Sequence, residues 1–107
     1  MNTKIPKAPS HLEKAGKSFW RRIMAEFAVQ DPHHLELLTQ ACRCLDRIEQ
    51  ARSEVATAGA YYQDRFFQPR PHPGLAVERD QRVLFCRLLR EMALDIAPPE
   101  SRPPARY

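Results

Sequence analysis

The sequence has little glycine and little cysteine, and it has no long apolar run. Its three glycines are scattered, so no glycine-rich loop that could cradle a phosphate is present. Its three cysteines are an odd number, which fits a reducing compartment better than a disulfide framework. No stretch approaches the roughly 18 apolar residues of a transmembrane helix, and no signal-peptide pattern is found. We therefore expect a soluble intracellular protein with no membrane partner.

Residue types that catalyse reactions or bind metals are present, but their spacing is unfavourable. Cys42 and Cys44 are two residues apart in a predicted helix and would point to different faces. His33 and His34 are adjacent, so neither pair has the spacing of zinc ligands. No serine, cysteine or histidine stands in a recognisable nucleophile setting. We expect no enzymatic activity, no metal and no cofactor.

The balance of charges is basic. Lysine and arginine number 17 against 13 aspartates and glutamates, which gives a net charge of +4 and a pI near 9.3. Such a surface favours an anionic partner without proving one. A chain of 107 residues fits one domain with a modest core.

The stretch from Asp31 to Gly59 predicts one long helix. Asp31-Pro32 combines a side-chain acceptor with a proline whose φ already suits the first helical turn. Gly59 is the residue type that most easily ends a helix in the left-handed conformation. A helix from 32 to 58 is more than twice the usual length of about 11 to 12 residues. This length suggests partner helices from the same chain or from other copies of it.

A first helix is predicted from about His11 to Val29. Ser10 and Glu13 have the spacing of a capping box, in which each side chain satisfies a free backbone N–H. Apolar residues recur on one face, and basic residues gather on the opposite one. The basic side chains are Lys14, Lys17 and Arg21.

The basic stripe on this helix allows two interpretations. It can be the solvated face of an ordinary amphipathic helix. It can also be a row of phosphate contacts, extended by Lys4 and Lys7 in an expected mobile arm of residues 1–9. Arg43 and Arg47 form a similar pair on the long helix, but nearby acidic residues dilute it.

The segment from Ala60 to Gly74 is the least regular part of the chain. Tyr61-Tyr62 and Phe66-Phe67 stand on either side of a short polar centre, followed by three prolines. This pattern predicts a loop or a tiny two-stranded hairpin. The rings could stack on nucleic-acid bases, or they could pack against the helices or a neighbouring subunit.

A third helix is predicted from about Leu75 to Leu94. Its apolar positions span roughly 200° of the helical wheel, wider than the ~100° stripe that one contact needs. We therefore expect one side to pack on the long helix and another on a second copy. The expected oligomer-interface residues are Leu84, Phe85, Leu88 and Met92.

The domain organisation follows from these elements. Residues 10–96 would form an all-α domain of three main helices, with the long helix at its centre and flexible termini on either side. Residues 97–107 hold four prolines and have little to bury, so a disordered tail is expected.

The order of these features resembles the small terminase subunits of tailed phages, in the short all-helical branch of that group. The resemblance covers roughly residues 9–102. It rests on four motifs in order: Pro9-Ser10-His11-Leu12, Gly16-Lys17-Ser18-Phe19-Trp20, the helix opened by Asp31 and closed by Gly59, and His72-Pro73 before the third helix.

The resemblance implies a phage or prophage DNA-packaging factor that has no catalytic residues of its own. It would work in the cytoplasm of the bacterial host as a ring-like homo-oligomer. The ring would bind double-stranded DNA and hand it to a large terminase subunit that carries the ATPase and nuclease. Lys4, Lys7, Lys14, Lys17 and Arg21 would contact DNA, while Arg102 and Arg106 in the tail would dock the large subunit.

Two other functions are open at this point. A helix-turn-helix regulator would place its turn at Val29 to Pro32, followed by a recognition helix with few donors for base edges. A protein-only adaptor would use none of its charges for DNA.

Overall fold

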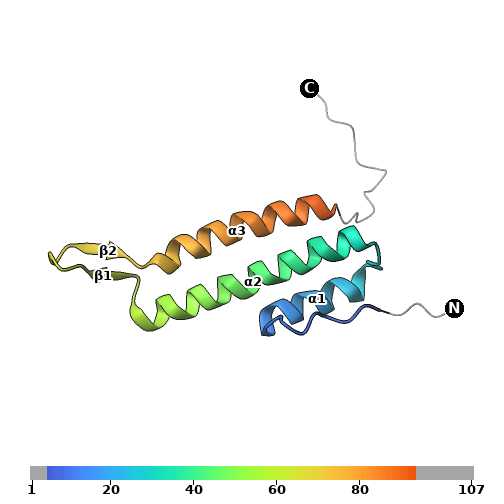
Figure 1. Cartoon of the computed structure of the whole chain (residues 1–107), viewed down its shortest axis with the longest axis horizontal. Helices are drawn as coiled ribbons and strands as arrows, with labels where there is room; N and C mark the ends of the chain where they lie inside the picture. The colour runs from blue at the N-terminus through green and yellow to red at the C-terminus, as the bar shows by residue number, and fades with distance from the viewer. Residues whose placement is uncertain (1–4, 94–107) are drawn as a thin grey trace, which may run out of the picture.

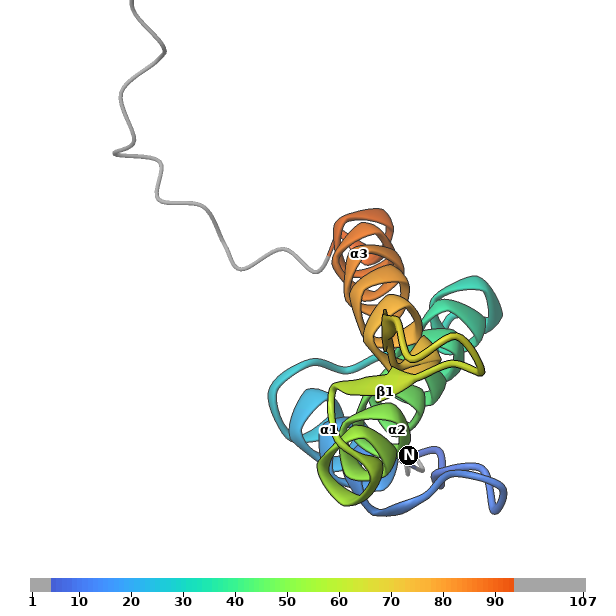
Figure 2. The ribbon, with the colours of Figure 1, turned by 90° about the vertical axis from the view of Figure 1, so that its left-hand side faces the viewer.

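The computed structural model describes residues 5–93 and confirms an all-α protein with three helices and one small hairpin. Helix α1 spans Lys14–Glu26, α2 spans Pro32–Ala58 and α3 spans Pro73–Met92. Strands β1 (Tyr61–Gln63) and β2 (Pro69–Pro71) connect α2 to α3. Helix α2 lies in the middle, and α1 and α3 pack along different sides of it (Figures 1 and 2).

Helix α2 begins and ends where the sequence predicts. The Asp31 carboxylate accepts a hydrogen bond from the His33 amide at 2.9 Å, and Pro32 occupies the first turn. At the other end, Gly59 has a φ of 95°, a value that side-chain-bearing residues rarely adopt. These local signals set the helix boundaries because both act within one turn of backbone.

Helix α1 differs from its predicted bounds. It runs from Lys14 to Glu26, and its N-cap residue Glu13 makes no side-chain capping bond. Instead, one carboxylate of α2, Asp46, accepts hydrogen bonds from the backbone amides of Glu13 and Gly16, each at 2.7 Å. The predicted capping box of Ser10 and Glu13 is therefore wrong, because a side chain from another helix already satisfies these amides.

Helix α3 begins two residues earlier than predicted. The Nδ1 atom of His72 accepts a hydrogen bond from the Gly74 amide at 2.8 Å, so the imidazole serves as the N-cap. Pro73 fills the first position, where its missing N–H costs nothing. The helix ends at Met92, and the predicted end at Leu94 lies outside the described residues.

The segment between α2 and α3 forms a two-stranded hairpin, which is one of the two predicted alternatives. Tyr61 pairs with Pro71 and Gln63 with Pro69 in antiparallel register. All four rings of this segment are exposed, with fractions from 49% for Tyr62 to 78% for Phe67. Of the alternatives for these rings, packing against the chain's own helices is therefore not found within residues 5–93. Packing on a neighbouring subunit and stacking on nucleic-acid bases stay predictions. The hairpin projects beyond the ends of α2 and α3 (Figure 1).

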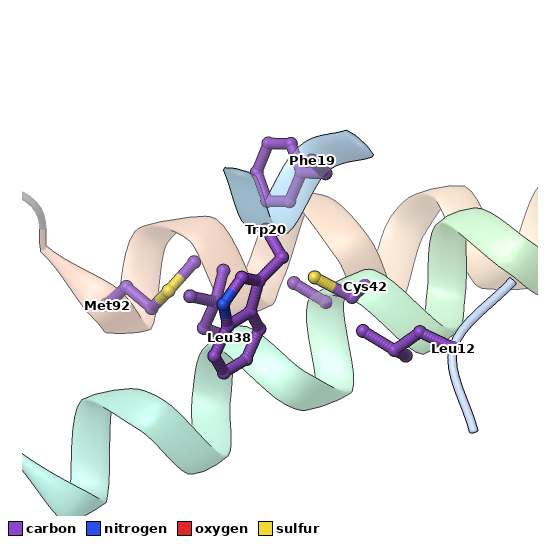
Figure 3. Close-up of a cluster of buried hydrophobic side chains, with 7 residues drawn as sticks. Leu12, Phe19, Trp20, Leu38, Cys42 and Met92 are labelled. Atoms are coloured by element: carbon purple, nitrogen blue, oxygen red, sulfur yellow. The ribbon is translucent and has the colours of Figure 1, made fainter. Parts of the chain in front are cut away.

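The core forms where all three helices meet. Figure 3 shows side chains from the three helices converging there, together with Leu12 from the segment before α1. The rings of Phe19 in α1 and Phe85 in α3 meet edge to face at 5.4 Å between centroids. The fully or largely buried members of this cluster are Leu12, Phe19, Trp20, Leu38, Ala41, Cys42 and Met92.

The N-terminal segment is held against α1. The indole nitrogen of Trp20 donates a hydrogen bond to the Pro6 carbonyl at 3.1 Å, and the Leu12 amide donates to the Pro9 carbonyl at 3.2 Å. This stretch of the N-terminal segment therefore contacts α1, whereas its mobility stays a prediction. Lys4 and the predicted tail of 97–107 lie outside the described residues.

Candidate functional site

The candidate site is a surface of basic side chains contributed by the N-terminal segment, α1 and α2. We call it the basic surface, and its members are Lys7, Lys14, Lys17, Arg21, Arg43 and Arg47.

Helix α1 directs its basic residues outward because its apolar face is fixed in the core. Phe19 and Trp20 are buried at 8% and 4% exposure, and Gly16 lies against α2. The opposite face is therefore turned to solvent. Lys14 and Arg21 are exposed on it, and Lys17 is half-buried at its edge.

Lys14 lines the same surface hollow as Arg43 and Arg47 of α2. A surface hollow of about 670 Å³ lies between the start of α1 and the middle of α2, lined by Lys14, Arg43 and Arg47 among other residues. The two arginines are exposed. The prediction gave this pair little weight because nearby acidic residues dilute it, and the sequence did not show that α1 begins beside it. Its i,i+4 spacing was the only signal in the sequence.

Acidic residues also line this hollow, but one of them, Asp46, is already engaged in hydrogen bonds. Both Asp46 oxygens accept backbone hydrogen bonds, from Glu13 and Gly16. Glu13 and Glu49 complete the acidic lining and are exposed. The hollow is therefore mixed in charge, with its long basic side chains free to reach outward.

A second hollow brings Lys7 and Arg21 together. It has a volume of about 570 Å³ and lies between the N-terminal segment and α1, with Trp20 and Met24 in its lining. The bond from Trp20 to the Pro6 carbonyl positions the segment here. Two of the predicted DNA contacts, far apart in sequence, thus share one side of α1.

The charges of the basic surface have no acidic partner within the described residues. The ion pairs of residues 5–93 involve other cations. Among them are Arg70 with Asp64 at 2.9 Å and Arg82 with Glu78 at 2.6 Å. None involves a member of the basic surface. An unpaired cation breaks no internal ion pair when it binds an external anion.

The predicted interface residues of α3 do not share one surface. Leu84 is 40% exposed, whereas Phe85 and Leu88 are half-buried against the core. Met92 is completely buried within its own chain, so it has no surface to offer a second copy. The helical wheel shows the width of an apolar arc but not how much of that arc α2 covers. Arg102 and Arg106 lie outside the described residues.

The two buried thiols of α2 are held in their neutral form. Burial, aided by the nearby Asp46 charge, raises the pKa of the Cys42 thiol to about 12. Burial also raises the pKa of Cys44 above its ordinary value. Both thiols are therefore neutral near pH 7, and the thiolate is the nucleophilic form. No group of three or more metal-ligating side chains occurs within residues 5–93.

Among the helices described, none is both long enough and apolar enough to cross a bilayer. Comparison with protein-family models, with curated proteins and with solved structures gave no match to this chain.

Proposed function

We propose that this protein is a non-catalytic viral DNA-packaging factor. It binds double-stranded phage DNA as a ring-like homo-oligomer and hands the DNA to a large terminase subunit that supplies the ATPase and nuclease. It acts in the cytoplasm of the bacterial host. The observation that supports the DNA-binding part is the basic surface. Lys14, Arg43 and Arg47 line one hollow, Lys7 and Arg21 line another, and none of these cations has an acidic partner within residues 5–93.

The chemistry of this surface suits the DNA backbone. Lysine and arginine side chains that neutralise phosphates release counterions, and this gives affinity without a choice of sequence. A few contacts per copy give weak binding. A ring repeats the same surface, so its combined affinity for one DNA molecule far exceeds that of a single copy.

The helix-turn-helix alternative fits the geometry less well. Such a motif joins two helices at about 90–120° through a turn of about three to four residues. Here α1 and α2 pack side by side in opposite directions, joined by residues 27–31 (Figure 1). The start of α2 also carries few donors that could read base edges.

A protein adaptor is the second candidate, and the exposed rings of the hairpin favour it. Solvent-exposed aromatic residues are typical of protein-binding surfaces. An adaptor would leave the basic surface fully solvated, so DNA binding separates the two functions.

The test measures binding to a fluorescent DNA duplex of random sequence by anisotropy, over a series of salt concentrations. The K14E/K17E/R21E variant reverses three charges of the basic surface. We expect its affinity to fall by at least tenfold at low salt. We also expect its salt dependence to flatten by about one unit of slope for each phosphate that the protein no longer neutralises.

The matched control reverses three arginines on the outer face of α3, in the variant R79E/R87E/R90E. It changes the net charge by the same amount and leaves the basic surface intact. We expect it to bind DNA much more tightly than K14E/K17E/R21E. Equal losses in both variants would show that only net charge matters, and unchanged binding in both would favour the adaptor.

A further inference from the structure

A surface hollow lies where the last turn of α3 meets the connection between α1 and α2. Its volume is about 320 Å³, at the lower end of the range of about 300 to 1,000 Å³ for ligand pockets. Residues 27–31, His34, Met92 and Ala93 line it. We call it the exit hollow, because Ala93 is the last residue of α3's C-terminal turn that the structure describes.

The lining of the exit hollow is mostly apolar. Phe27, Ala28 and Val29 face the end of α3 across it. Its only ionisable side chains are Asp31 and His34, which lie 3.8 Å apart. Asp31 also accepts the amide of the first turn of α2 as its N-cap. An apolar segment therefore suits this hollow better than a charged ligand.

Helix α3 ends in the geometry of a Schellman motif. Ala93 has φ and ψ of 46°, a left-handed conformation that is unfavourable for a residue with a side chain. Its amide donates a hydrogen bond to the Arg90 carbonyl at 3.1 Å, which is the inner of the two bonds of the motif. The outer bond would join the Leu94 amide to the Leu89 carbonyl. Such a bond brings the chain back over the last helical turn.

The sequence after Ala93 has apolar residues at the positions that this geometry favours. In a Schellman motif, the residue after the left-handed one commonly contacts an apolar residue of the last turn. Leu94 holds the first position, and its counterpart Leu89 is 36% exposed. Leu89 lies three residues before Met92, so it borders the side of α3 that lines the exit hollow. Ile96 follows Leu94 by two residues, and an extended chain directs both to the same side.

We propose that residues 94–97 fold back over the end of α3 and close the exit hollow. Leu94 covers Leu89, and Ile96 enters the hollow beside Val29 and Met92.

The occupant is this segment of the same chain because of where the segment starts. Ala93 is itself part of the lining, so the next residues are present at a high effective concentration. The N-terminal segment, in contrast, lines two other hollows, through Ile5 and Pro6.

The contact would limit where the following residues can reach. Arg102 is six residues after Ile96, and six residues span at most about 20 to 22 Å. Arg102 would therefore stay within that distance of the exit hollow. Its role in docking the large subunit rests on the proposed function, whereas the contact needs neither DNA nor that subunit. A failure of the contact can thus be told apart from a failure of the proposed function.

The experiment is methyl NMR spectroscopy on the full chain without DNA. We expect nuclear Overhauser effects between the methyl groups of Leu94 and Leu89, and between those of Ile96 and Val29. In the variant L94S/I96S, the methyl signals of Val29 and Met92 should shift because their cover is removed. The matched control P103S/P104S changes two residues beyond the proposed contact and should leave these signals in place.

A second pair of variants blocks the hollow from its opposite wall. Ala28 lines the exit hollow, whereas Ala25 lines two other hollows, and both residues are exposed. A28E places a carboxylate beside the proposed apolar contact and should abolish the Overhauser effects of Ile96. A25E makes the same change outside the exit hollow and should keep them. Circular dichroism checks that each variant keeps its helices.

Three results would overturn the proposal. The first is the absence of both Overhauser effects in wild type, with the Leu94 and Ile96 signals at the positions of an unfolded peptide. The second is an effect found only between differently labelled copies in a mixed sample, which would place the segment in the hollow of a neighbouring copy. The third is an equal loss of the Ile96 effects in A28E and A25E, which would show that the exit hollow does not hold this side chain.

Discussion

Aromatic residues meet opposite environments in two regions of this molecule. Phe19 and Trp20 lie where three helices converge and are 8% and 4% exposed. Phe66 and Phe67 lie on the hairpin and are 70% and 78% exposed. Both pairs are adjacent aromatic residues, so residue type alone does not decide burial. The difference shows which apolar surface the chain uses to fold and which it leaves exposed.

The largest expected effect comes from the same substitution made in each region. Phe19→Ala should lower the free energy of unfolding by about 3 to 5 kcal/mol, because it opens a cavity in the core. Phe66→Ala should change it by less than about 0.5 kcal/mol in the monomer, because the ring is exposed. Urea denaturation at low protein concentration measures both values. Similar losses in the two variants would contradict the contrast between the regions.

Gly16 tests how closely the core region is packed. A Cβ atom at this position would lie 2.6 Å from Asp46 Oδ2 and 2.8 Å from the Cys42 carbonyl oxygen. Gly16→Ala should therefore destabilise the protein by about 1 to 3 kcal/mol, although alanine favours helices. Thermal unfolding measures the loss, with the exposed Ser18→Ala as control. A stabilised Gly16→Ala variant would mean that α1 and α2 are further apart than described.

Asp46 tests the cap that α2 provides for α1. Asp46→Ala leaves the amides of Glu13 and Gly16 without their acceptor, and we expect a loss of about 1 to 2 kcal/mol. Glu49→Ala removes a carboxylate from the same hollow without touching a cap, so it should cost much less. Hydrogen exchange should show faster exchange at the start of α1 in Asp46→Ala alone. Unchanged exchange there would argue against this cap.

The smallest expected effect concerns the hairpin at low pH. Hydrogen bonds from the Gln68 amide, the Arg70 side chain and the Phe66 amide hold the pKa of Asp64 below its ordinary value of 3.8. The ionised form is thus favoured in the folded hairpin. Its contribution is present above pH 3.8 and is lost as the pH falls through the lowered pKa.

An NMR titration measures this effect directly. The amide signals of Phe66 and Gln68 should move with a midpoint below pH 3.8, while signals of core residues stay in place. Asp64→Asn should abolish the transition. A midpoint at or above 3.8 would show that the hydrogen bonds of the turn do not persist in solution.

The sequence predicted the bounds of the three helices with different accuracy. Both ends of α2 were predicted correctly, since Asp31-Pro32 and Gly59 act on the backbone beside them. The bounds of α1 were not, because its N-terminal amides bind a carboxylate thirty or more residues away. The start of α3 was missed by two residues, since histidine is an uncommon N-cap.

The candidate site was only partly predictable. The spacing of Lys14, Lys17 and Arg21 placed them on one face of α1, and the structure places that face outward. The sequence did not show that Arg43 and Arg47 lie across a hollow from Lys14. It also did not show that Met92 is buried while Leu84 is exposed, because both fall within one apolar arc.

The sequence by itself determined the number of helices, the limits of α2, the basic stripe and the aromatic segment. Periodicity and capping residues encode these features locally. Only the tertiary structure decided that Asp46 caps α1, that Trp20 bonds to the Pro6 carbonyl, and that the hairpin rings find no cover within residues 5–93. Those outcomes depend on which surfaces meet in space, and contacts between residues distant in sequence leave no local pattern.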